Sequence, residues 1–249
     1  MNLNLKFLLI VQDESELVPI MLSRVLDEFR ENIVGVMIIS PFKHLPHPLR
    51  TIRHAFNLLG PVEFVRTAVK QIFSSKSVKS ICLKNNCNIT SYIYPNSPKF
   101  REIIRNYEVD ILISLACPII LCRETIEAPN LCSINVHGSY LPDFRGVSTV
   151  FWAMLKGADR TGTTVHKMTT KIDSGDYFYR ESIPITQEST LFGLYKNVAD
   201  KGGELLVRTL HDACNDKMKT YPIPHGGQYV SFPQWTDGLE FRRKGLKYR

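Results

Sequence analysis

The chain has 249 residues, of which 44% are hydrophobic and 22% are charged, and its formal net charge at pH 7 is +7. This balance excludes an intrinsically disordered chain, and the length suits one large α/β domain or one domain with a small appendage. The positive charge favours anionic partners such as phosphorylated substrates, acidic cofactors or nucleic acid, without choosing among them.

The first half of the chain alternates apolar runs with segments of helical spacing. Residues 5–12 and 33–40 are typical of buried strands, and residues 14–31 between them have the spacing of a helix, which makes a β-α-β unit with parallel strands. Residues 41–60 contain three prolines and a closing glycine, so we expect an inserted excursion there. The elements expected next are a basic helix at 61–86, a strand at 89–95, a helix at 98–107, and strands at 109–120 and 131–137.

The alternation changes after this last strand. We expect a helix pair, or one helix broken near Gly202 and Gly203, over residues 189–216. Residues 217–249 are rich in proline and glycine and are expected to form a small irregular C-terminal appendage. The fold class is therefore α/β, with a mostly parallel sheet and helices on both of its faces. The other elements expected in this half are a helix at 148–157 and strands at 161–170 and 177–185.

Two polar residues end the strand expected at 131–137. Asn135 and His137 are two positions apart, so they point to the same side of the strand, roughly 6–7 Å from each other. In a parallel sheet this is the carboxyl edge, where α/β proteins bind ligands. An amide can hold an oxyanion and an imidazole suits acid–base chemistry near neutral pH. The alternative is that Asn135 caps a loop and His137 is a hydrogen-bonded residue at a strand end.

A second polar stretch, "KIDSGDYFYRE", places Asp173 in a loop between two expected strands. A carboxylate at this position can face His137 across the end of the sheet. The three side chains would then form a site for acyl transfer to an amine. Asp173 would orient the imidazole or relay protons, His137 would accept the amine proton, and Asn135 would hold the oxyanion.

The two stretches together resemble the folate-dependent formyltransferases, a family that includes glycinamide ribonucleotide, methionyl-tRNA and sugar N-formyltransferases. The resemblance is firm over residues 109–210 and implies a Rossmann-like catalytic domain over 1–216, with 10-formyltetrahydrofolate as the donor and no metal. It also implies that Ser139, Arg145 and Gly146 bind the acceptor. The residues that match the family signature are Asn135, His137, Ser139, Leu141, Pro142, Arg145 and Gly146, followed by Asp173.

The family's pterin pocket is lined by the loop after the strand that precedes the motif. The resemblance therefore implies a folate-binding role for Cys117, Pro118, Ile119 and Leu121, with the Asp173 loop opposite them. Taken alone, this apolar segment is equally typical of a protein core. His44 and His47 have a His-x-x-His spacing, but two such residues without a nearby acidic or cysteine partner make a poor metal site.

Departures from the family pattern indicate which acceptor substrate to expect. The first β-α turn contains no glycine but has Asp13, Glu14 and Glu16, which would repel a substrate phosphate. Too few residues follow the last expected helix for the tRNA-binding domain of methionyl-tRNA formyltransferases. The expected acceptor is therefore a small primary amine, with a nucleotide-linked amino sugar as the best fit and no nucleic-acid partner.

Three alternatives stay open beside this interpretation. They are a methionyl-tRNA formyltransferase-like enzyme, a formyltetrahydrofolate hydrolase in which water replaces the amine, and a non-catalytic Rossmann binding module. The six cysteines form no Cys-x-x-Cys pair, and no run approaches the roughly 20 apolar residues of a membrane span. We therefore expect reduced thiols in a cytoplasmic protein without a membrane partner. The oligomeric state is left open, a homodimer included.

Overall fold

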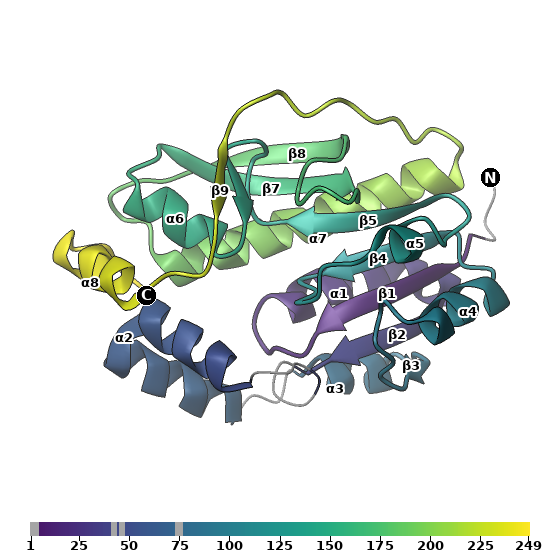
Figure 1. Cartoon of the computed structure of the whole chain (residues 1–249), viewed down its shortest axis with the longest axis horizontal. Coiled ribbons are helices and arrows are strands. Elements are labelled where there is room, and N and C mark those ends of the chain that lie inside the picture. The colour runs from purple at the N-terminus through teal and green to yellow at the C-terminus, as the bar shows by residue number, and fades with distance from the viewer. Residues whose placement is uncertain (1–4, 41–43, 45–47, 73–76) are drawn as a thin grey trace.

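The computed structural model describes residues 5–40, 44, 48–72 and 77–249. Its centre is a seven-stranded sheet in the order β3-β2-β1-β4-β5-β7-β8 (Figure 1). The first five strands in this order are parallel, whereas β7 runs antiparallel to β5 and β8 antiparallel to β7. The expected mostly parallel sheet is confirmed. The strands are β1 (Phe7–Gln12), β2 (Ile33–Ile39), β3 (Ile89–Thr90), β4 (Ile111–Leu115), β5 (Cys132–His137), β7 (Arg160–Lys167) and β8 (Tyr177–Pro184).

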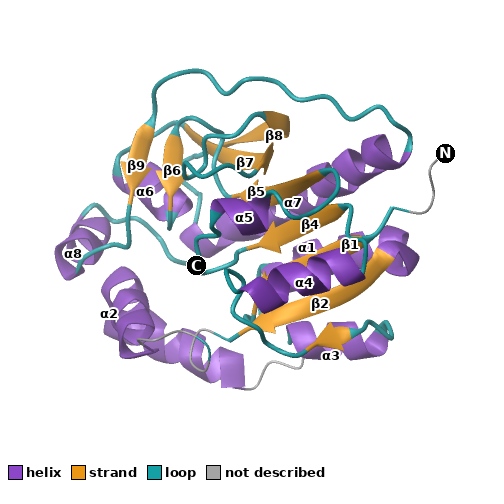
Figure 2. Ribbon diagram, turned by 45° about the vertical axis from the view of Figure 1, so that its right-hand side comes forward, coloured by secondary structure: helices purple, strands orange, loops and turns teal. Residues whose placement is uncertain are grey.

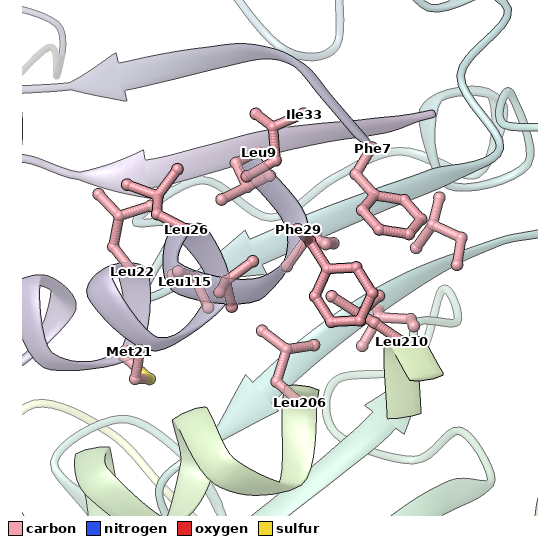
Figure 3. Close-up of a cluster of buried hydrophobic side chains, with 14 of the residues drawn as sticks. Phe7, Leu9, Met21, Leu22, Leu26, Phe29, Ile33, Leu115, Leu206 and Leu210 are labelled. Atoms are coloured by element: carbon pink, nitrogen blue, oxygen red, sulfur yellow. The ribbon is translucent and has the colours of Figure 1, made fainter. Parts of the chain in front are cut away.

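Helices cover both faces of this sheet, as its apolar strands require. One face is covered by α1 (Val18–Phe29), α3 (Val78–Lys84) and α7 (Leu191–Cys214), and the other by α4 (Pro98–Asn106) and α5 (Arg123–Ile126) (Figure 2). In the first core, Phe29 of α1 lies between the sheet and Leu206 and Leu210 of α7 (Figure 3). Each fully buried side chain of this size stabilises the fold by roughly 1.5–3 kcal/mol.

The last long helix is continuous, so the expected break near Gly202 and Gly203 is wrong. Both glycines are buried inside α7. A Cβ atom on Gly202 would lie 2.8 Å from Val136 Cγ1 of β5, and one on Gly203 would lie 3.1 Å from Met21 Cα of α1. The glycines therefore allow α7 to approach the sheet and α1 closely, and this packing offsets their low helix propensity.

The excursion expected at 41–60 is helical from its eighth residue, which corrects the sequence prediction. Helix α2 (Pro48–Ile72) contains a kink at Gly60, whose φ is +71°, before Pro61. Proline removes a helical hydrogen bond and so marks the kink. The basic helix expected at 61–86 is also not continuous: its first part belongs to α2, and its last part is the separate helix α3. Ser77 caps α3 by accepting a hydrogen bond from the Ser80 N–H. Residues 41–43, 45–47 and 73–76 lie outside the described part.

The segment after α7 contains more regular structure than its proline and glycine content indicates. Strand β9 (Gln228–Val230) pairs in parallel with β6 (Phe144–Gly146). Helix α8 (Trp235–Arg243) packs against α2, and its Phe241 ring stacks 4.9 Å from that of Phe151 in α6 (Thr149–Leu155). The C-terminal segment thus returns to the sheet's carboxyl edge and holds β6 in place. Across the described ranges, no helix combines the length and apolarity needed to cross a membrane.

Candidate active site

Three neighbouring strands place polar side chains in one row on the face covered by α4 and α5. Ser114 of β4 lies opposite Asn135 of β5, and Asn135 lies opposite His166 of β7. Ser114 Oγ donates a hydrogen bond to Asn135 Oδ1 at 2.9 Å. Asn135 Nδ2 lies 3.3 Å from His166 Nε2. This row crosses a sheet whose other central positions are almost all apolar, so each polar group needs a partner inside the row.

His137 lies one pleat further along β5, at the carboxyl end of the strand, and is 6% exposed. Its Nε2 is 2.9 Å from the carbonyl oxygen of Phe144. A carbonyl only accepts hydrogen bonds, so Nε2 carries the hydrogen and Nδ1 carries the lone pair of the neutral ring. Nδ1 faces Asp173 Oδ2 at 3.5 Å. The structure therefore brings the basic nitrogen of His137 beside a carboxylate.

Asp173 reaches this position through an unusual loop between β7 and β8. Its φ is +48°, in the left-handed region that aspartate tolerates better than most residues. Gly175 follows closely, and a Cβ there would lie 1.9 Å from the Lys167 carbonyl oxygen. Asp173 Oδ2 accepts a hydrogen bond from the Gly146 N–H at 2.8 Å, and Oδ1 lies 3.6 Å from His166 Nε2. The loop thus holds the carboxylate between two histidines.

Burial and charge act in opposite directions on these two groups. Burial lowers the pKa of His137, and the neighbouring Asp173 charge and the Phe144 carbonyl only partly offset this effect. Burial alone would raise the pKa of Asp173, but His137, His166 and the Gly146 N–H outweigh it and lower the pKa to about 2. At neutral pH the site therefore contains an ionised carboxylate next to an imidazole that favours its neutral form.

The residues expected to bind the acceptor lie in the turn after β5 and in β6. Ser139 is buried, and its Oγ accepts a hydrogen bond from the Phe144 N–H, so it holds the turn together. Gly146 has a φ of +102°, and a Cβ there would lie 2.0 Å from the Val230 carbonyl oxygen of β9. Arg145 is half-buried, and its Nε has no hydrogen-bond partner among the described residues.

The segment from 116 to 122 follows β4 on the same face as Asn135. Cys117 and Ile119 are half-buried and pack against the core under α4 and α5, Leu121 is buried in that core, and Pro118 is exposed. Burial raises the pKa of the Cys117 thiol to about 11, so the thiol is neutral. The segment contains no charged side chain. Its exposed surface is therefore apolar side chains and backbone groups, which suit an uncharged heterocycle.

The sequence analysis singled out neither Ser114 nor His166 as a residue of the site. In the structure the partners of His166 are Asn135 and the Lys167 carbonyl, with Asp173 nearby. The available signal for Ser114 was a single polar residue inside the apolar run "DILISL". Neither residue could be linked to Asn135 without the strand order.

Other polar features lie away from this cluster. His44 stacks on Tyr92 with ring centroids 3.8 Å apart and accepts a hydrogen bond from the Ser40 N–H, whereas His47 lies outside the described residues. In the part of the chain that is described, no group of three or more His, Cys, Asp or Glu side chains is placed to hold a metal ion. A surface hollow at the amino-terminal edge of the sheet is lined by Lys6, Arg105, Glu108, Asp110 and Asn130.

The part of the chain that contains this cluster is similar in sequence to known formyl transferases. The model of a family described as formyl transferase matches residues 69–210. A methionyl-tRNA formyltransferase of Clostridium perfringens is 34% identical over 142 residues, which are 57% of this chain and 46% of that protein. The chain spans about half the length of the curated relatives it matches.

Comparison with solved structures supports the same fold at lower identity. An N-formyltransferase of Helicobacter canadensis, in complex with folinic acid and dTDP-3-aminofucose, superposes with a TM-score of 0.62 at 19% identity, over 91% of this chain and 71% of that one. A phosphoribosylglycinamide formyltransferase of Anaplasma phagocytophilum superposes with a TM-score of 0.64 at 13% identity, over 92% and 98% of the two chains.

Proposed function

The chain belongs to the formyl transferase family, and we propose that it transfers a formyl group from 10-formyltetrahydrofolate to a primary amine. The observation that carries this proposal is the convergence of Asn135, His137 and Asp173 at the carboxyl edge of the sheet. An amide, a neutral imidazole and an ionised carboxylate are the groups that acyl transfer to an amine requires. We assign the activity to residues 1–216, with 217–249 as an appendage.

His137 is the proposed base. The acceptor attacks as a neutral amine and has to lose a proton as its new bond to the formyl carbon forms. His137 Nδ1 has the lone pair to take this proton, and Asp173 Oδ2, 3.5 Å away, balances the positive charge that results. His137 then returns the proton to the departing nitrogen as the old carbon–nitrogen bond breaks. His137 is therefore neutral again at the end of the reaction, and the proton of the acceptor amine has moved to the departing nitrogen.

Asn135 is the proposed donor to the negative charge that develops on the formyl oxygen. One hydrogen of its Nδ2 faces His166. The second hydrogen of the same nitrogen is left for the substrate. Removing a donor of this kind from acyl-transfer enzymes lowers the rate by roughly a hundredfold to a thousandfold.

When bound, 10-formyltetrahydrofolate supplies a formyl group on a nitrogen that can leave. The segment from 116 to 122 fits its uncharged ring system, because it combines a neutral thiol, apolar surface and backbone groups on the face that bears Asn135. Cys117, Pro118 and Ile119 would contact the ring, and Leu121 would support them from the core. The Asp173 loop would lie opposite.

The first β-α turn bears on the acceptor. The carboxylate of Glu14 accepts hydrogen bonds from the N–H groups of Glu16 at 2.9 Å and Leu17 at 2.7 Å, and also from Val18. These amides at the start of α1 are therefore not free to bind a substrate phosphate. This arrangement supports a small amine other than glycinamide ribonucleotide, and we propose a nucleotide-linked amino sugar. Arg145 would bind an anionic group of this nucleotide-linked sugar. The identity to methionyl-tRNA formyltransferases makes methionyl-tRNA the second candidate.

The test supplies 10-formyltetrahydrofolate with a nucleotide-linked amino sugar, glycinamide ribonucleotide or charged initiator tRNA, and measures formylated product. We expect efficient formylation of the sugar alone. Formylation of glycinamide ribonucleotide or of the tRNA, without formylation of the sugar, would show that the proposed acceptor is wrong and would leave the proposed formyl transfer intact. Release of formate that does not depend on any amine would instead indicate a hydrolase, and absence of both donor binding and turnover would indicate a non-catalytic module.

A further inference from the structure

The Asn135 side chain has two chemically different ends, and only one of them can stabilise a developing negative charge. Its Nδ2 donates hydrogen bonds, whereas its Oδ1 accepts them and would repel an anionic oxygen. The two ends have nearly the same shape, so packing alone does not choose between the two orientations of the amide. Hydrogen-bond partners have to make that choice.

In this structure a chain of hydrogen bonds selects the orientation of the Asn135 amide. The Lys167 carbonyl oxygen lies 3.0 Å from His166 Nδ1 and can only accept, so Nδ1 carries the hydrogen of the neutral ring. His166 Nε2 is then left to accept a hydrogen bond, and the Nδ2 end of Asn135 lies 3.3 Å from it, whereas Asp173 Oδ1 at 3.6 Å is beyond hydrogen-bond distance. Oδ1 is thereby directed toward Ser114, whose Oγ donates to it at 2.9 Å. Ser114 closes the chain.

The surroundings of Ser114 indicate that its hydroxyl has a specific task. It is 2% exposed and stands between Ile113 and Leu115, which are both fully buried in the core on the other face of the sheet. Within the described residues, the hydrogen bond that its side chain makes is the one to Asn135. A buried hydroxyl destabilises a strand unless it is paired, so an apolar residue would serve the core better here.

We propose that Ser114 is a positioning residue for formyl transfer, which holds the Asn135 amide with its Nδ2 hydrogens toward His166 and the reacting carbon. The inference rests on the proposed function for its effect on the rate. It concerns the orientation of one amide, however, and this can be observed without turnover. Without the hydroxyl, Asn135 Oδ1 has no donor on the β4 side, so the amide is held at its Nδ2 end alone and its orientation is less firmly fixed.

The first experiment compares Ser114→Ala and Ser114→Cys with Ser133→Ala. Cysteine keeps the volume of serine but donates weakly, so it guards against a folding defect in the alanine variant. Ser133 is a matched control, because it is 1% exposed, lies on the same side of β5 as Asn135, and donates instead to the Ile126 carbonyl at 2.7 Å. We expect both Ser114 variants to lose about tenfold in kcat, the scale of one hydrogen bond, with KM unchanged. Ser133→Ala should keep its kcat.

A second experiment separates positioning from a structural role. In the Asn135→Ala background, Ser114→Ala should cause no further loss of kcat, because there is no amide left to orient. A further tenfold loss in that background, or full kcat in a folded Ser114→Ala enzyme, would overturn the proposal.

NMR tests the orientation directly. The side-chain amide signals of Asn135, identified by their absence in Asn135→Ala, should shift and broaden in Ser114→Ala but not in Ser133→Ala. Unchanged signals would refute the positioning role. If these signals respond as expected while no acceptor is formylated, the proposed function fails and the hydrogen-bond chain stands.

Discussion

Two half-buried carboxylates at the same edge of the sheet differ in what surrounds them. Glu14 follows β1 and Asp173 follows β7, and both accept hydrogen bonds from backbone N–H groups. Burial raises the pKa of Glu14 above its usual value, although three backbone N–H groups oppose this effect. The pKa of Asp173 is instead lowered to about 2. The strands that precede the two turns, β1 and β7, are separated in the sheet by β4 and β5.

The difference shows what backbone amides can and cannot do for a buried charge. Three neutral amides at the start of a helix do not offset the desolvation of Glu14, whereas two imidazoles and one amide more than offset that of Asp173. Glu14 acts as a helix cap, which satisfies N–H groups that would otherwise lack partners. Asp173 acts through charge, because the neighbouring His137 can take up a proton. The comparison predicts that the two carboxylates will respond differently to the same substitution.

The largest expected effect is on turnover. His137→Ala or Asp173→Ala should lower kcat by at least about a hundredfold, the usual scale for losing a positioned acid–base group. Steady-state formylation assays of folded protein would measure this loss. Asp176→Asn is the matched control, because Asp176 is an exposed acid near the same turn, and it should keep its kcat. Normal turnover in either alanine variant would show that the roles are misassigned.

A smaller effect, in the pH dependence of the rate, sharpens the contrast between the two carboxylates. Burial lowers the pKa of His137 below its ordinary 6.5, so the neutral base persists to lower pH and kcat at saturating acceptor should fall only below pH 6.5. In Asp173→Asn the negative charge that raises this pKa is lost. The acid limb of the remaining activity should therefore move to still lower pH. A limb above pH 6.5, or one that Asp173→Asn leaves in place, would contradict the assigned base.

The smallest expected effect is on stability. Glu14→Ala leaves the first N–H groups of α1 without their carboxylate and should lower the free energy of unfolding by about 1 kcal/mol, as for the loss of other helix caps. Denaturant unfolding measures this difference, and kcat of the folded variant should stay close to normal with a nucleotide-linked amino sugar. A hundredfold loss of kcat in Glu14→Ala would remove the distinction between the two carboxylates.

Local pattern was sufficient for much of the fold and for part of the site. The alternation of apolar runs and helical spacings predicts the parallel sheet, and β3, β4 and α1 differ from the expected ranges mainly in length. Predictions from local sequence pattern were wrong where contacts with residues distant in the sequence determine the secondary structure. Val136 and Met21 explain why α7 continues through Gly202 and Gly203. Pairing with β6 explains why part of a segment rich in proline and glycine forms β9.

The sequence by itself determined that Asn135 and His137 share one side of a strand end, because side chains alternate with a period of two along any strand. It also placed Asp173 in a turn. Only the tertiary structure decided that Ser114 and His166 flank Asn135, because strand order and register depend on how whole faces pack against helices. The protonation states follow from the same packing, since burial and the distance between His137 and Asp173 arise only when the chain is folded.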